Sequence, residues 1–188
     1  MRKIRVYFDF ICPYCYTAWA HFRQLRRDGI DLDIEWYGWE IHPDRRNDKP
    51  QHAFFTPEQE KEFAALGHPS GVNATTLRYI APSYDALRLL CAAQEQHLTQ
   101  EWIDRVFKGV YQEGQAMSDH DVLRAWADVI GLADADTVLT TTRYADTLAA
   151  HDAHCMDLAL EYVPTVEEND RIICSGVLTY QDLYHALT

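Results

Sequence analysis

The chain has 188 residues, of which 47% are apolar and 12% aromatic, enough to bury the core of one domain or of a domain with a large insertion. Its formal net charge of -12 disfavours nucleic acid and anionic membranes as partners, because both are bound by clustered lysine and arginine. No run of about eighteen apolar residues and no cleavable leader pattern is visible, so we expect a cytoplasmic protein without a membrane span.

The first predicted element is a strand over residues 4–11, which runs directly into Cys12-Pro13-Tyr14-Cys15. This spacing separates two thiols by one helical turn. A thiolate at Cys12 would be stabilised by the unpaired N–H groups and positive dipole end of the helix that follows. Pro13 suits a first helical turn. We therefore expect Cys12 to attack disulfides and Cys15, deeper in the helix, to act as the resolving thiol.

Apolar residues at helical spacing predict a helix over residues 13–28, which Gly29 ends. Alternating apolar and polar residues then predict a half-exposed strand over residues 30–37. A strand, helix and strand in this order form a parallel crossover if both strands share a sheet. Residues 42–49 are polar and rich in turn formers, which indicates a loop.

The middle of the chain is predicted to be helical. Thr56 and Gln59 form a capping box for a helix that ends near Gly67, and residues 68–81 are expected to be irregular. Further helices are expected to be capped by Ser83, Thr99 and Ser118, and a last helical region to run from Asp134 or Asp136 to about residue 161 with a break near His151.

The end of the chain returns to strands. Residues 163–166 and 171–174 are predicted to pair as a hairpin, and Thr179 with Asp182 caps a final helix. The overall pattern predicts an α/β protein with a helical insertion. We expect a first part of the main domain at residues 1–44, the helical insertion at residues 45–150, and the second part of the main domain at residues 151–188.

A C-x-x-C pair can also be half of a zinc site, which would need a second Cys/His pair at ligand spacing. Cys91, Cys155 and Cys174 are well separated, and the nearest candidate cluster is His151, His154 and Cys155. Redox chemistry therefore accounts for the dithiol better than a metal does. We expect no metal, and the other three cysteines are interpreted as reduced thiols.

The dithiol at the first helix, Val163-Pro164-Thr165 before a late hairpin, and the helical block between them resemble the DsbA-like branch of the thioredoxin superfamily. Asp9 to Tyr16, Glu40-Ile41-His42-Pro43 and Ser83 to Leu89 further resemble the FrnE-type oxidoreductases. The resemblance spans nearly the whole chain. It implies a thioredoxin-like α/β fold with a large helical insertion.

The resemblance also implies roles for individual residues. The catalytic residues would be Cys12, Cys15 and a cis-proline at Pro164, and Val163 would offer its backbone to an extended substrate. Substrate binding would also involve Pro13, Tyr14 and Thr165. The alternative for Pro164 is an ordinary trans-proline at a strand start, where a missing N–H is tolerated.

Three features bear on this resemblance. Tyr14 stands where FrnE-type members commonly have tryptophan, which leaves the redox potential open. Glu167 and Glu168 replace an apolar run, so we expect an edge strand there. Asp9 is expected either to relay a proton from Cys15 or to accept local backbone N–H bonds.

The leading hypothesis is a thiol-disulfide oxidoreductase acting through a mixed disulfide on a protein, peptide or glutathione disulfide, with no required cofactor. Glutathione is a possible co-substrate. One alternative is a glutathione-dependent isomerase or transferase of the hydroxychromene-carboxylate isomerase or kappa type, which the complete C-x-x-C disfavours. Another is a binding or chaperone module in which the dithiol is incidental. Neither nucleic acid nor membrane is expected as a partner, and the oligomeric state is left open.

Overall fold

The computed structural model describes residues 1–188, and its contacts divide the chain into two compact units. Unit 1 comprises Met1–Tyr37, Phe55–Thr75 and Ala159–Thr188, and unit 2 comprises Gly38–Phe54 and Thr76–Leu158. The expected domain boundaries at residues 44/45 and 150/151 stay a prediction, since compact contact units are not the same as folding domains.

Unit 1 is built on a four-stranded sheet with the strand order β2-β1-β5-β6. Its strands are β1 (Arg2–Phe8), β2 (Leu32–Gly38), β5 (Thr165–Glu168) and β6 (Arg171–Ser175). The Arg2 N–H donates to the Asp31 carbonyl at 2.9 Å, so β1 and β2 start at the same end and run parallel. β5 is antiparallel to both β1 and β6. The sheet is therefore mixed, and the predicted parallel crossover and late hairpin are both present.

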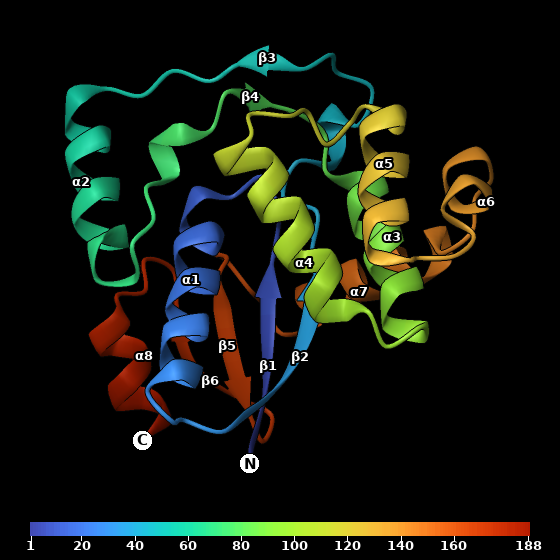
Figure 1. The fold of residues 1–188 in the computed structure, drawn as a ribbon. Helices are drawn as coiled ribbons and strands as arrows, with labels where there is room; N and C mark the ends of the chain where they lie inside the picture. Colours follow the sequence, from blue (N-terminus) through green and yellow to red (C-terminus); the bar gives the residue numbers. More distant parts are fainter. The chain divides into compact units, whose positions relative to one another are not determined.

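Helices cover this sheet. α1 (Pro13–Arg27) lies beside α8 (Tyr180–Leu187), and α2 (Pro57–Gly67) also contacts α1 (Figure 1). Beneath α1, Phe8 and Phe22 meet Trp36 edge to face, with ring centroids 5.2 and 5.7 Å apart. These three rings are almost fully buried. The predicted helix over residues 13–28 is confirmed, as are the capping boxes that begin α2 and α8.

The expectation that the strand after Pro164 lies at a sheet edge is wrong. β5 lies between β1 and β6, and Glu167 is only 5% exposed. Its carboxylate accepts hydrogen bonds from Tyr7 and from Arg5, both on β1. Glu168 pairs with Arg2 in the same way. The cross-strand partners satisfy both carboxylates, which allows an acidic pair in an interior strand.

Unit 2 is mainly helical. It contains α3 (Tyr84–Glu95), α4 (Thr99–Phe107) continued by a π-helical turn (Lys108–Gln112), α5 (His120–Ile130), α6 (Ala135–Thr140) and α7 (Ala145–Asp157). A short ribbon pairs β3 (Gln51–His52) with β4 (Tyr79–Ile80). A single turn of 3-10 helix occurs in this unit at Pro43–Arg45. Two further turns follow α2, at His68–Ser70 in unit 1 and at Ala74–Thr76, where unit 1 passes into unit 2. The sequence indicated the helices but not the ribbon, because two-residue strands carry no periodic signal.

Two predicted helix caps were wrong by one residue: Asp119 rather than Ser118 caps α5, and Leu98 rather than Thr99 precedes α4. Ser83 is the N-cap of α3 as predicted, but its side chain makes no capping hydrogen bond. The break in the last helical region lies between Thr140 and Ala145, not near His151. Capping residues that follow one another compete for the same role, and only the folded chain selects between them.

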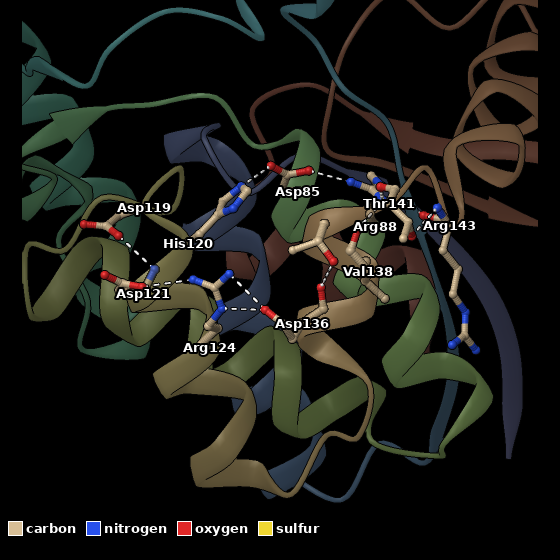
Figure 2. Close-up of polar contacts among 11 residues, drawn as sticks. Asp85, Arg88, Asp119, His120, Asp121, Arg124, Asp136, Val138, Thr141 and Arg143 are labelled. Carbon is tan, nitrogen blue, oxygen red and sulfur yellow. Dashed lines mark hydrogen bonds and ion pairs between the residues drawn. The ribbon is translucent and has the colours of Figure 1, made fainter.

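Arg88 explains where that break falls. Its buried guanidinium donates to the Arg143 carbonyl at 2.9 Å and to the Val138 and Thr141 carbonyls at the end of α6. It also pairs with Asp85, which in turn contacts His120 at 2.8 Å, as Figure 2 shows. The last carbonyls of a helix have no partner within the helix. Arg88 supplies those partners, so the chain can leave α6 inside a packed unit.

No helix in residues 1–188 combines the length and apolar character that crossing a membrane would require.

Candidate active site

The dithiol lies where β1 passes into α1. The chain turns after Phe8, and the Cys12 N–H donates to the Asp9 carbonyl at 3.2 Å. Cys12 is the N-cap of α1 and Pro13 occupies its first turn. Cys12 and Cys15 are both free thiols, 6% and 2% exposed. The placement predicted from the spacing of the motif is therefore observed.

The two thiols differ in acidity. The Cys15 thiol donates to the Cys12 sulfur and lowers the pKa of Cys12, helped by backbone N–H groups at the helix start and opposed by burial and by the Asp9 charge. Burial, together with the same hydrogen bond, raises the pKa of Cys15 well above its usual value. A thiolate therefore forms at Cys12 first, and Cys15 keeps its proton.

This difference predicts selective alkylation. Because its pKa is lowered, Cys12 should carry a larger thiolate fraction at neutral pH than an ordinary thiol, and its reaction with iodoacetamide should rise with pH through a midpoint below 9.0. Cys174, whose pKa burial raises to about 11, is the internal control and should react only at higher pH. Mass spectrometry of digested protein would measure both profiles. Equal profiles for Cys12 and Cys174 would contradict the assigned acidity.

The Val163–Pro164 loop meets the dithiol from the other end of the chain. The Val163–Pro164 bond is cis, and the Cys12 thiol donates to the Val163 carbonyl at 3.6 Å. Thr165 donates to the Tyr162 carbonyl at 2.6 Å and also contacts Ser175 on β6. The loop is thus held by side chains on both strands of the hairpin. Tyr162 and Ser175 were not among the residues that the sequence indicated.

Asp9 is fully buried in the turn before Cys12. Its carboxylate accepts the Ile11 N–H at 3.4 Å, which is the local backbone bond that one of the two expectations named. Its charge also raises the pKa of both thiols. The proton relay from Cys15 stays a prediction.

Histidines are candidate bases for a dithiol, so the positions of His21 and His42 are relevant here. His21 is buried on α1, and its Nδ1 lies 2.6 Å from the Ser70 hydroxyl. Burial lowers the pKa of His21 to about 4, so this histidine is neutral at physiological pH. His21 contacts the Ser70 hydroxyl and the ring of Tyr180 rather than a thiol, which makes it a packing residue of α1. His42 is exposed and belongs to unit 2.

Two residues of α2 that the sequence did not indicate contact Tyr14, which lies between the two thiols in the sequence. The Tyr14 hydroxyl donates to the Glu62 carboxylate at 3.0 Å, and the Tyr14 ring lies 5.0 Å from the ring of Phe63. Nothing in the spacing of residues 12–15 could have identified partners 48 and 49 residues away.

The remaining polar and sulfur groups do not form a second site of this kind. Cys91 and Cys155 are buried, and burial raises the pKa of each thiol to about 12. His151, His154 and Cys155 lie on α7, and no three His, Cys, Asp or Glu side chains in residues 1–188 gather in a group able to hold a metal ion.

A mixed sheet, a helix that starts at a pair of thiols, and a cis-proline loop touching the first thiol define a thioredoxin-like protein. The chain belongs to the family of DSBA-like thioredoxin domains, whose model matches residues 3–188. This family includes thiol-disulfide oxidoreductases and related isomerases and transferases.

The chain is also similar to individual proteins. The chain is 29% identical over 183 residues to the uncharacterized protein YwbO of Bacillus subtilis (strain 168), covering 90% of this chain and 88% of that one. It is similar in structure to a probable DsbA oxidoreductase, SCO1869, of Streptomyces coelicolor, with a TM-score of 0.84 and 22% identity over 100% of this chain and 88% of that one.

A second structural relative is the cytosolic disulfide reductase DsbM of Pseudomonas aeruginosa, solved with GSH. Its TM-score is 0.67 at 18% identity, covering 96% of this chain and 91% of that one. At these identities, the two structural relatives show a shared fold.

Proposed function

We propose that the protein is a thiol-disulfide oxidoreductase in which Cys12 attacks and Cys15 resolves. The Cys12 thiolate attacks one sulfur of a substrate disulfide, forming a mixed disulfide and releasing the other sulfur as a thiolate that takes up a proton. The Cys15 thiol then loses its proton and attacks Cys12. The second substrate thiol leaves, and two electrons have passed from the dithiol to the substrate. The same steps in reverse oxidise a substrate dithiol.

The observation that carries this proposal is the contact between the Cys12 thiol and the Val163 carbonyl, beside a Cys15 of raised pKa. An attacking thiol needs a low pKa and a position that a substrate disulfide can reach. A resolving thiol needs to stay protonated until the mixed disulfide forms. Pro13, Tyr14, Val163 and Thr165 line or support this approach, and Pro164 shapes it. Family membership and the cytosolic disulfide reductase among the structural relatives also support a cytoplasmic enzyme of this kind.

Trapping tests the mechanism. In a Cys15→Ser variant the mixed disulfide at Cys12 has no resolving thiol, so we expect a stable adduct with a disulfide substrate, visible as a mass increase that dithiothreitol removes. The wild-type protein under the same conditions should retain almost no adduct. If Cys15→Ser forms no adduct with any reducible protein, peptide or glutathione disulfide, the proposed mechanism is wrong.

A glutathione-dependent isomerase or transferase is the second candidate, and the observation that favours it is the fold shared with a 2-hydroxychromene-2-carboxylate isomerase, at a TM-score of 0.63 and 16% identity over 97% of this chain and 91% of that one. In that case glutathione would act as a cofactor, and Cys15 would be dispensable. Activity that requires glutathione and survives Cys15→Ser would support this candidate over the dithiol reaction.

A further inference from the structure

Glu62 on α2 is a charged side chain that contacts the residue between the two thiols. Tyr14, between the two thiols in sequence, donates its hydroxyl to the Glu62 carboxylate at 3.0 Å. The Tyr14 ring packs on Phe63, the next residue of α2, with centroids 5.0 Å apart. Glu62 is exposed, whereas Phe63 is buried. The contact therefore fixes a solvent-facing carboxylate at the rim of the site.

The basic residues of unit 1 lie mostly at the other end of the sheet. These residues, apart from Lys61 on α2, are Arg2, Lys3, Arg5, Arg23, Arg26, Arg27 and Arg171. The first three start β1, the next three lie in the second half of α1, and the last one starts β6. Cys12 lies after the end of β1 and at the start of α1. Pro164 directly precedes β5, and its carbonyl accepts the Gly176 N–H after the end of β6, so it does not contact the basic starts of β1 and β6. The topology of unit 1 thus separates its basic residues from the dithiol, except for Lys61, which precedes Glu62 on α2.

The groups near the dithiol are instead carboxylates and aromatic faces. Asp9 is buried beside both thiols. Glu161 is exposed, and the next residue, Tyr162, is 62% exposed directly before the Val163 that Cys12 contacts. Such groups attract ammonium and guanidinium ions through charge and through the faces of aromatic rings. They repel anionic ligands such as glutathione, which carries two carboxylates against one ammonium.

We propose that the dithiol acts preferentially on disulfides flanked by lysine or arginine in extended polypeptide segments, and that Glu62, positioned by Tyr14, is a specificity determinant. The inference rests on the proposed dithiol reaction, whose covalent steps it leaves unchanged. Complementary charge acts chiefly on the rate of encounter between enzyme and substrate. The preference is therefore expected in the second-order rate constant of the reaction between the reduced protein and the disulfide.

The test compares two peptides that carry the same intramolecular disulfide and differ only in having lysine or glutamate next to the cysteines. The reduced protein is mixed with each peptide at low ionic strength, and the second-order rate is followed by tryptophan fluorescence in a stopped-flow instrument. We expect the lysine peptide to react about five to ten times faster than the glutamate peptide. Added salt at about 0.5 M should reduce that ratio, because it screens exposed charges.

Two glutamates on α2 provide a matched pair of variants. Glu62→Gln is expected to lower the preference about threefold, whereas Glu60→Gln should leave it unchanged. Both glutamates are exposed and both changes remove one negative charge, but the two positions lie about 200° apart around the helix. Tyr14→Phe keeps the ring on Phe63 and removes the hydroxyl that holds Glu62, so it should also weaken the preference.

Three results would overturn the inference. These are equal rates for the two peptides with the wild-type protein, an equal loss of preference in both glutamate variants, and a faster reaction with glutathione disulfide than with the lysine peptide. Failure of the dithiol reaction itself would look different. In that case neither peptide would react and Cys15→Ser would trap nothing.

Discussion

Cys12→Ser is expected to lower the rate of disulfide exchange by about a thousandfold or more, because it removes the nucleophile of the first step. A serine hydroxyl has no accessible anionic form at neutral pH and cannot form a disulfide. The Cys15 thiol and the N–H groups at the start of α1 lower the pKa of Cys12. In the serine variant these groups would have no thiolate to stabilise. The measurement is the rate of reduction of a peptide disulfide by the reduced protein, followed over a single turnover.

Cys174→Ser is the matched control for this experiment. Cys174 is a free, half-buried thiol on β6 whose pKa burial raises to about 11. Its replacement should leave the rate close to that of the wild-type protein. A Cys12→Ser variant that retains a rate similar to that of Cys174→Ser would show that exchange proceeds through another thiol.

Arg88→Met is expected to destabilise the protein by about 3–5 kcal/mol, the range found when one partner of a buried ion pair is removed. Methionine fills much of the volume but donates no hydrogen bond. The carbonyls of Val138, Thr141 and Arg143 would lose their donor in a buried region, and Asp85 would lose one of its two partners. A loss of this size is a large fraction of the typical stability of a domain.

Arg124→Met provides the comparison. Arg124 also pairs with two carboxylates, those of Asp121 and Asp136, but it lies on the surface of the same unit (Figure 2). Exposed ion pairs contribute little, because water and salt screen them. Urea unfolding followed by circular dichroism should therefore show a much lower midpoint for Arg88→Met and a nearly unchanged one for Arg124→Met. Equal midpoints for the two variants would refute the structural role assigned to Arg88.

The sequence by itself determined the order of the elements and the location of the thiols. Thr56 with Gln59 and Thr179 with Asp182 form the predicted capping boxes, and Pro13 begins α1 directly after Cys12. These features depend on side chains within one helical turn of each other, so local patterns suffice to predict them. The helix with Cys12 at its start therefore follows from the residues around it. The choice between adjacent capping candidates, such as Ser118 and Asp119, did not follow.

Only the tertiary structure decided which distant residues complete the site. The contact of Cys12 with Val163, the hydrogen bond from Tyr14 to Glu62, and the burial of Glu167 between β1 and β6 each join segments far apart in the chain. No periodic pattern encodes such pairs, because they depend on strand order and helix packing. An acidic residue that looks suited to an exposed edge can lie in an interior strand once a partner such as Arg5 is beside it. Charge at the rim of the dithiol is likewise a product of the fold, since it depends on which end of each strand and helix the chain brings there.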